Sequence, residues 1–204
     1  MTPRSTNPRT RTIPDRLAAI ATAVAAAIVV VAIAVGLFLT PAWVGFEQGR
    51  SQAAAWTGYS EADLRTATNA ILHDLVLGPP DFAVEIGGTP VLTARERSHM
   101  RDVRGVFGSF AVLVLAAATV LIALFALQRR RGRSDRAWSA IRSGMRWLIV
   151  GIVVAGVIAT FFFDVAFEIF HRLFFTGGSY TFDPRTDRLV QLFPFQFWSE
   201  PTIV

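Results

Sequence analysis

The sequence predicts an all-α integral membrane protein that crosses the bilayer with three helices. Hydrophobic residues make up 52% of the 204-residue chain, and the mean hydropathy is +0.45. Three apolar runs each exceed the roughly 20 residues that a helix needs to cross a bilayer. They occupy residues 17–39, 103–128 and 147–170. We therefore expect a multi-pass membrane protein.

The arginine distribution predicts how these helices are oriented. All 20 basic residues are arginine, and 11 of them lie before the first run or between the second and third runs. Basic residues gather in the cytoplasmic loops of membrane proteins. This places segments 1–16 and 129–146 in the cytoplasm, and segments 40–102 and 171–204 outside it. We interpret these arginines as topology signals that also contact anionic membrane lipids, and not as a nucleic-acid surface.

The first apolar run has features of both a signal peptide and a membrane anchor. It follows a basic start, but it is 23 residues long and no small-residue cleavage site directly follows it. A signal peptide has a shorter apolar core and such a site. We therefore expect an uncleaved anchor.

Segment 40–102 is predicted to contain short helices. Ser60 with Asp63, and Thr93 with Glu96, have the spacing of a capping box, which marks a helix start. A helical apolar face follows the first box and ends before Gly78; it consists of Leu64, Ala67, Ile71 and Leu75. A Gly-Gly turn at 87–88 separates two extended pieces. The second box opens a helix that continues into the span at 103–128.

Polar side chains gather at the end of the third run. Asp164, Glu168 and His171 are spaced i, i+4 and i+7, so they share one helix face. Acids within a transmembrane helix are costly and usually face a protein interior or a wet cavity. The alternative is that Glu168 and His171 simply lie in the lipid headgroup region.

A second cluster precedes the second run. Glu96, His99 and Asp102 are neighbours on one helix, and His99 lies four residues before the apolar run. The second and third spans are joined by a link of 18 residues, which predicts antiparallel neighbours. His99 and His171 should then converge at a similar depth. We interpret His73 as an ordinary polar position.

Two converging imidazoles with nearby acids predict proton transfer. Histidine titrates near neutral pH, so one ring can take a proton while the other donates one or stabilises charge. Acids behind the rings would fix their orientation. An alternative is a metal-dependent membrane hydrolase, with two histidines and Asp164 or Glu168 on zinc, although no compact ligand motif is present. Neither cysteine nor a G-x-S-x-G motif is present. A further alternative is a non-catalytic membrane protein that packs with a partner.

Three segments carry a resemblance to a known family. Residues 96–104 read E-x-x-H-M-x-D-V-R, residues 170–175 read F-H-x-x-F-F, and residues 182–198 end in L-V-x-x-F-P-x-x-F-W. In this order and spacing, they resemble the bacterial integral membrane family that includes the lipoprotein intramolecular transacylase. The resemblance runs from about Leu17 to the end of the sequence.

The resemblance implies a reaction and a site. Such an enzyme moves the sn-2 acyl chain of a diacylglyceryl-modified lipoprotein to the amine of the same molecule, at the outer leaflet of the cytoplasmic membrane and without a cofactor. It implies that His99 and His171 are the catalytic pair. From the residues themselves, we expect Asp164, Glu96, Asp102 and Glu168 to orient or support them. The aromatic stretch from Phe170 to Trp198 would bind acyl chains and cover the site, with these residues: Phe170, Phe174, Phe175, Tyr180, Phe193, Phe197 and Trp198.

The sequence departs from the family pattern at two places. Tyr180 stands where the family has tryptophan. The family has a fourth span after the F-W pair, whereas this sequence ends at Val204. We therefore expect three spans in this chain.

Overall fold

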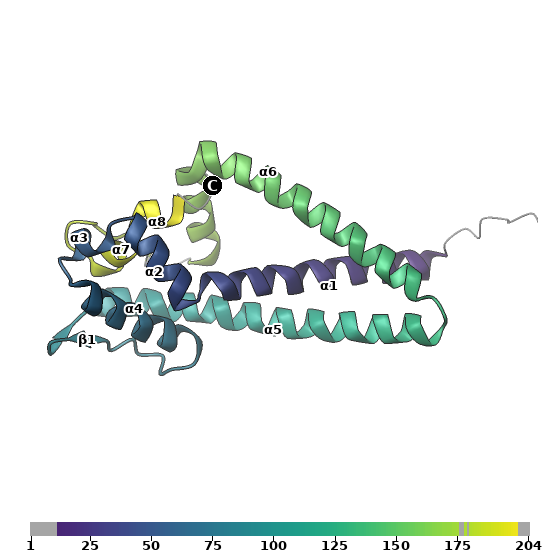
Figure 1. Ribbon diagram of the computed structural model, residues 1–204, viewed down its shortest axis with the longest axis horizontal. Helices are drawn as coiled ribbons and strands as arrows, with labels where there is room; N and C mark the ends of the chain where they lie inside the picture. Colours follow the sequence, from purple (N-terminus) through teal and green to yellow (C-terminus); the bar gives the residue numbers. More distant parts are fainter. Residues whose placement is uncertain (1–11, 176–177, 179, 200–204) are drawn as a thin grey trace, which may run out of the picture. The chain divides into compact units, whose positions relative to one another are not determined.

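The computed structural model is almost entirely helical, which confirms the predicted fold class (Figure 1). It describes residues 12–175, 178 and 180–199, so parts of the predicted segments 1–16 and 171–204 lie outside the described residues. The elements, in order, are α1 (Ile13–Phe38), α2 (Pro41–Arg50), α3 (Ala53–Thr57), α4 (Glu61–Val76), β1 (Glu85–Ile86), β2 (Thr89–Pro90), α5 (Ala94–Arg130), α6 (Ser134–Phe174), α7 (Arg188–Leu192) and α8 (Phe195–Ser199). They form two compact units: residues 1–31 with 114–150, and residues 32–113 with 151–204.

Three of these helices are long and apolar enough to cross a membrane: α1, α5 and α6. With 37 residues, α5 is about 55 Å long at 1.5 Å per residue. The hydrocarbon core is only about 30 Å thick. The first two turns of α5, which carry Glu96 and His99, therefore extend beyond the apolar run, as the second capping box predicts.

The third long helix, α6, is interrupted once. Phe162 leaves the helical conformation, with φ −135° and ψ 36°. Asp164, Glu168 and His171 all follow this break, so they remain on one regular helical segment and keep their predicted spacing. No proline or glycine lies within five residues of Phe162, so the sequence did not predict the interruption.

In the first unit, α1 and α6 approach each other closely through small residues. The buried residues of α6 in this unit are Ala137, Ala140 and Gly144. A Cβ atom on Gly144 would lie 2.5 Å from the carbonyl oxygen of Ala23 in α1. Small residues at such positions let membrane helices pack backbone against backbone. The absence of a side chain at Gly144 is therefore a requirement of this contact.

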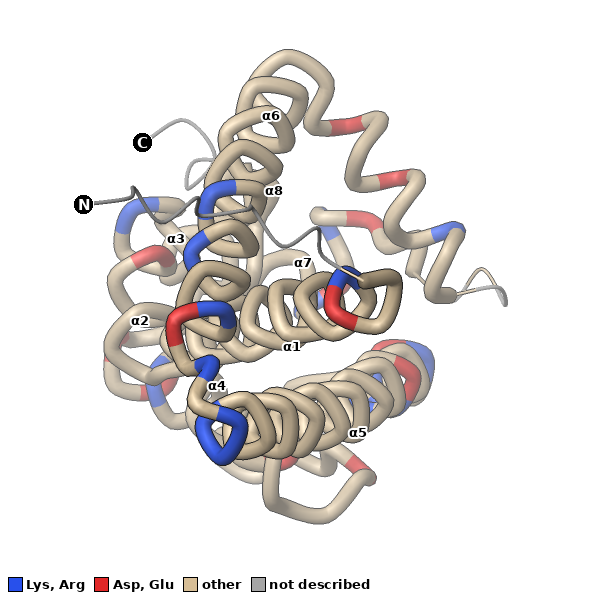
Figure 2. The backbone as a smooth tube through the Cα atoms, turned by 90° about the vertical axis from the view of Figure 1, so that its right-hand side faces the viewer, with Lys and Arg blue, Asp and Glu red and all other residues tan. Residues whose placement is uncertain are grey.

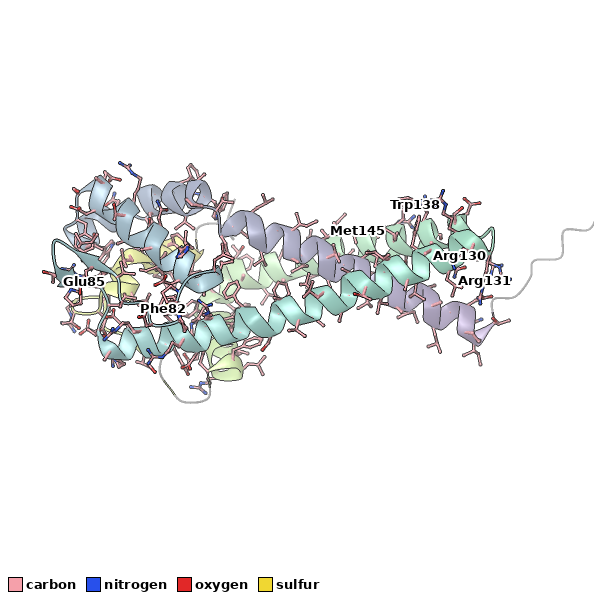
Figure 3. The ribbon with its side chains drawn as sticks, turned by 90° about the horizontal axis from the view of Figure 1, so that it is seen from below. Phe82, Glu85, Arg130, Arg131, Trp138 and Met145 are labelled. Carbon is pink, nitrogen blue, oxygen red and sulfur yellow. The ribbon has the colours of Figure 1, made fainter. Side chains whose placement is uncertain are left out.

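Basic residues surround the turn between α5 and α6 (Figure 2). Arg130 and Arg131 lie at the end of α5, and Trp138 lies near the start of α6 (Figure 3). In the same unit, Asp15 pairs with Arg133 at 3.3 Å and with Arg136 at 3.2 Å. One acid near the start of α1 thus ties that helix to the basic turn.

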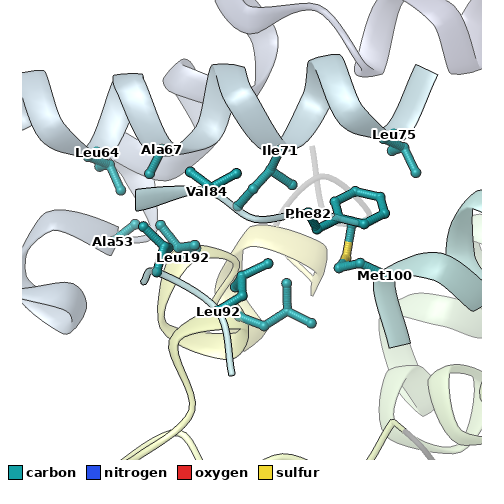
Figure 4. Packing of buried hydrophobic residues seen from close by; sticks show 12 residues of the cluster. Ala53, Leu64, Ala67, Ile71, Leu75, Phe82, Val84, Leu92, Met100 and Leu192 are labelled. Carbon is teal, nitrogen blue, oxygen red and sulfur yellow. The ribbon is translucent and has the colours of Figure 1, made fainter. Parts of the chain in front are cut away.

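The second unit contains a small packed region that we call the cap, defined as residues 40–102 with 180–199. Its core follows the predicted apolar face of α4, which is confirmed: Leu64, Ala67, Ile71 and Leu75 are all buried (Figure 4). Against this face pack the following buried residues of other segments: Ala53, Phe82, Val84, Met100 and Leu192. The local sequence was therefore sufficient to predict α4 and its buried face. Residues from both stretches of the cap, 40–102 and 180–199, complete the core.

The predicted Gly-Gly turn closes a short hairpin. The strands β1 and β2 pair antiparallel, and Gly87 and Gly88 between them have φ of 58° and 76°. A two-residue hairpin loop with positive φ at both positions favours glycine, because a side chain is strained there. The turn prediction is confirmed.

The aromatic segment that we expected to be a loop contains two short helices, α7 and α8. Polar contacts join this segment to the rest of the cap. Gln48 donates from Nε2 to the hydroxyl of Thr68 and to the carbonyl of Leu192, both at 2.9 Å. Arg188 donates to the carbonyl of Thr57 at 2.5 Å. Five-residue helices carry too little periodicity to be recognised, and long-range contacts stabilise them here.

We predict that Gly144→Ala destabilises the protein. The added methyl group would meet the Ala23 backbone, and such overpacking typically costs about 1–3 kcal/mol. Thermal unfolding in detergent should therefore begin at a lower temperature. Gly151→Ala is the matched control, because nothing lies within 4 Å of a Cβ there. Equal stability of the two variants would contradict the close α1–α6 contact.

Candidate active site

The His99 side chain is enclosed by aromatic rings. Only 6% of the residue is exposed, and its ring centroid lies 4.9 Å from that of Phe175 and 5.4 Å from that of Phe182. Its Nδ1 atom is buried and has no hydrogen-bond partner among the described residues. This burial is the largest cause that lowers the pKa of His99 from 6.5 to about 4, with His171 adding to the effect and Asp102 opposing it. His99 is therefore a neutral imidazole at pH 7.

His171, at the end of α6, has a defined tautomer. Its Nδ1 atom lies 2.8 Å from the carbonyl oxygen of Phe167. Because a carbonyl oxygen can only accept, Nδ1 carries the hydrogen, and Nε2 of the neutral ring keeps its lone pair. The His171 ring also lies 4.0 Å from the Phe167 ring and 5.1 Å from the Tyr180 ring, centroid to centroid.

The two histidines converge, as their positions in the sequence predict. Their ring centroids are 6.3 Å apart and their planes are inclined by 22°. Phe175 lies against both rings, at 4.9 Å from His99 and 5.5 Å from His171. The site therefore consists of two nearly parallel imidazoles that share one aromatic neighbour.

The two acids of α6, Asp164 and Glu168, do not stand behind the His171 ring in the way that their spacing predicts. Asp164 is exposed, and no hydrogen bond or ion pair of the described residues involves it. Glu168 accepts from Arg172 at 2.7 Å and from the Tyr180 hydroxyl at 3.3 Å. Sharing a helix face with His171 is thus not enough to orient the ring, because the backbone carbonyl of Phe167 is closer and already satisfies Nδ1.

No group of three or more histidine, aspartate or glutamate side chains among the described residues has a geometry that could hold a metal. The zinc alternative needs His99, His171 and an acid of α6 to converge. Glu168 is engaged with Arg172 and Tyr180, and Asp164 faces outward. The donor set that this alternative requires is therefore not assembled.

The comparisons with known proteins agree with this architecture. A family model described as "Lipoprotein intramolecular transacylase Lit" matches residues 18–198. The chain belongs to the Lit family. An uncharacterized protein of Aquifex aeolicus (strain VF5) is 31% identical over 118 residues, which are 57% of this chain and 50% of that protein. The match therefore spans half the length of this curated relative.

Solved structures of a Lit protein share the fold. The membrane integral lipoprotein intramolecular transacylase Lit from Bacillus cereus superposes with a TM-score of 0.74, over 93% of this chain and 86% of that chain, at 16% identity. A variant of the same protein with one histidine replaced by alanine superposes with a TM-score of 0.72, over 93% and 85%, also at 16% identity. At this identity the likeness establishes the shared fold alone.

Glu96 of this Lit family member supports the backbone near His99 and not the ring itself. The side chain is completely buried, and its two carboxylate oxygens accept from the backbone amides of Thr93 at 2.7 Å and Leu189 at 2.6 Å. The first contact is the predicted capping box. The second joins the start of α5 to the start of α7. Glu96 therefore fixes the backbone around His99 and does not touch either ring.

The aromatic residues predicted as a lid fall into three groups. Phe175 and Tyr180 lie against the histidines, as described above. Phe170 and Phe174 are each 47% exposed, so they can contact lipid or acyl chains. The remaining three pack on one another near the end of the described chain: Phe193, Phe197 and Trp198. These last residues belong to the cap and make no described contact with the histidine rings.

Sequence reasoning missed two residues that hold the histidines. Phe182, within the tail motif of the Lit family, covers His99, and Arg95 lies 5.0 Å above the Phe182 ring while pairing with Asp187 at 2.7 Å. Phe167 supplies the carbonyl that fixes His171. Its position four residues before a helical histidine was the available signal. Nothing local in the sequence indicated that Phe182 would reach His99.

We predict that Glu96→Ala loosens the whole site. The buried Leu189 amide and the partly buried Thr93 amide would lose their acceptor, and a buried unsatisfied group costs about 1–3 kcal/mol. Thermal unfolding should begin earlier, and proteolysis within residues 180–199 should become faster. Glu85→Ala removes an exposed acid of the hairpin and should change the stability by less than about 0.5 kcal/mol. A Glu96→Ala protein as stable as the control would contradict the assigned role.

Proposed function

We propose that the chain is a membrane acyltransferase that moves the sn-2 acyl chain of a diacylglyceryl-modified lipoprotein to the N-terminal amine of the same molecule. The product is the lyso-form lipoprotein. The observation that carries this proposal is the pair of imidazole rings, 6.3 Å apart at the ends of two membrane helices. Membership of the family described as lipoprotein intramolecular transacylase supports the same reaction.

The reaction asks little more of a protein than proton transfer and charge stabilisation. The amine loses a proton and attacks the ester carbonyl, and the carbonyl oxygen becomes an oxyanion. The carbon–oxygen bond to glycerol then breaks, and the glycerol oxygen takes up a proton. Because donor ester and acceptor amine belong to one molecule, holding them together supplies much of the rate. No covalent enzyme intermediate is needed.

We assign the role of general base to His171. Its Nδ1 hydrogen is engaged with Phe167, so Nε2 is free to accept a proton from the amine. The imidazolium that forms can return this proton to the leaving glycerol oxygen. A positioned imidazole of this kind typically contributes about 10²–10⁴-fold to the rate.

We assign stabilisation of the oxyanion to His99. A ring whose pKa lies near 4 is neutral at pH 7, and its single N–H can be donated to the developing negative charge. The enclosing rings of Phe175 and Phe182 exclude water from it. Exclusion of water strengthens this hydrogen bond and protects the ester from hydrolysis.

We further propose that the N-terminus is cytoplasmic and that the site faces the outer leaflet. The support is the arginine distribution, with the basic α5–α6 turn at one end of α5 and His99 near the other. Membrane lipids and diacylglyceryl-modified lipoproteins are the expected partners. No cofactor has a part in the proposed chemistry.

The proposal predicts a change in where an acyl chain is attached. In a bacterial strain that carries a reporter lipoprotein, expression of the wild type should move one acyl chain from glycerol to nitrogen. His171→Ala and His99→Ala should each lower this conversion at least about 100-fold, the lower range for acid–base catalysis. Mass spectrometry of the reporter N-terminus measures the position of the acyl chain.

His73→Ala is the matched control, because the side chain of His73 is 62% exposed and lies on α4 away from the ring pair. This variant should convert the reporter like the wild type. An unchanged acyl position with folded wild-type protein would overturn the transacylase proposal and favour a non-catalytic membrane protein that packs with a partner.

A further inference from the structure

We propose that the cap is embedded in the membrane interface through two surfaces, one on α2 and one at the end of α4. The partner is the phospholipid bilayer itself, at the boundary between headgroups and acyl chains. We call these surfaces together the interfacial surface. The first surface consists of Trp43 and Phe46 of α2, together with Phe38 at the end of α1. The second consists of Val76 and Leu77 at the end of α4. This inference is independent of the proposed function.

Helix α2 buries two polar side chains, Glu47 and Gln48, and exposes one aromatic side chain, Phe46. Its buried residues are Val44, Glu47 and Gln48. Phe46, in contrast, is 57% exposed. A helix in water would present the opposite arrangement, with apolar residues against the core. An outward aromatic face is expected where the surroundings are lipid headgroups and the outermost acyl carbons.

The aromatic face of α2 is continuous with the surface of a membrane span. Trp43 lies 5.0 Å from Phe38, the last residue of α1, and 6.0 Å from Phe46, measured between ring centroids. Only Leu39 and Thr40 separate α1 from α2, and the Thr40 hydroxyl accepts from the Trp43 amide to start the new helix. Tryptophan at the end of a span is typical of the membrane–water interface. This continuity identifies lipid as the occupant of the face.

Helix α4 changes character along its length. Its exposed side chains near the N-terminus are polar and include Glu61, Arg65 and Thr66. At the C-terminal end, Val76 is 55% exposed and Leu77 is 81% exposed. An apolar end on an otherwise polar surface is expected only if that end alone leaves the water.

A half-buried arginine fixes the level of this apolar end. Arg104, at the edge of the apolar run of α5, donates to the carbonyls of Asp74 and Gly78. These carbonyls belong to the C-terminus of α4, where a cation is favourable. The contact holds Val76 and Leu77 at the level where α5 enters the hydrocarbon. Two independent segments of the cap therefore present apolar side chains beside the ends of two different spans.

The arrangement would set the depth of the ring pair. His99 lies five residues before Arg104, about 8 Å along the helix. With the cap resting on the interface, the rings stay near the level of the acyl ester groups. The interfacial surface would thus limit how deeply the cap enters the bilayer.

Site-directed spin labelling tests the proposal directly, because the chain contains no cysteine. Phe46→Cys and Leu77→Cys each introduce a single labelling site on the interfacial surface. Thr66→Cys is the matched control, since it lies on α4 about 16 Å before Leu77. The labelled full-length proteins are placed in bilayer nanodiscs of phosphatidylcholine and phosphatidylglycerol. Collision rates with oxygen, which partitions into lipid, are compared with those of a water-soluble nickel chelate.

We expect labels at positions 46 and 77 to collide more with oxygen than with nickel, and the label at position 66 to show the reverse. Equal nickel accessibility at the three positions would overturn the proposal, because the cap would then stand in water. Shielding from both reagents at 46 and 77 would also overturn it, since a protein surface would cover them.

A second measurement serves if a labelled variant fails to fold. A protein that keeps Trp43 alone, with Trp56, Trp138, Trp147 and Trp198 replaced by phenylalanine, reports on α2 through its fluorescence. Lipids brominated near the headgroup end of the acyl chain should quench it more strongly than aqueous acrylamide does. Stronger quenching by acrylamide would contradict an interfacial α2.

Discussion

One buried carboxylate holds this structure's two distant segments together. The oxygens of Glu96 bind the amides of Thr93 and Leu189, which are separated along the chain by the two membrane helices α5 and α6. The first bond starts α5, and the second anchors α7. A carboxylate in a completely buried position is stable only when its oxygens are satisfied in this way. A single side chain therefore joins the backbone just before His99 to the start of α7.

Several contacts at the site follow from that anchor. Once the start of α7 is fixed, Asp187 can pair with Arg95, and Arg95 covers the ring of Phe182. Phe182 in turn packs on His99 and contributes to its burial. The contacts therefore connect Glu96 to the Arg95–Asp187 ion pair, this pair to the Phe182 ring, and the Phe182 ring to His99. Residues far from His99 in the sequence thus contribute to the burial that lowers its pKa.

Local patterns predicted the helices well. The apolar runs, the capping boxes at Ser60 and Thr93, and the Gly87-Gly88 turn all depend on residues within a few positions of one another, and the structure contains each of them. The convergence of His99 and His171 was also predictable, because both lie at the ends of adjacent spans. Such inferences need only helix geometry and the thickness of a bilayer.

Long-range partners could not be read in the same way. The spacing between Thr93 and Glu96 predicted the capping box, but it carried no information about the second bond of Glu96, to Leu189. The shared helix face of Glu168 and His171 suggested an acid behind the ring, but the i−4 carbonyl and the Arg172 guanidinium were nearer partners. The short helices α7 and α8 were missed for the same reason, since contacts across the cap stabilise them. Each of these polar side chains could form hydrogen bonds with more than one set of partners, and the local sequence does not distinguish between them.

His99 and His171 have the same side chain, but we propose that their different surroundings give them different roles in proton transfer. Nitrogen-15 NMR of histidine-labelled protein in bilayers tests it most directly, since the chain has only three histidines and single-histidine variants assign them. We expect the neutral His171 ring to be the Nδ1–H tautomer, and His99 to stay neutral until the pH approaches 4. An Nε2–H tautomer at His171, or a His99 that becomes protonated near pH 6.5, would contradict it.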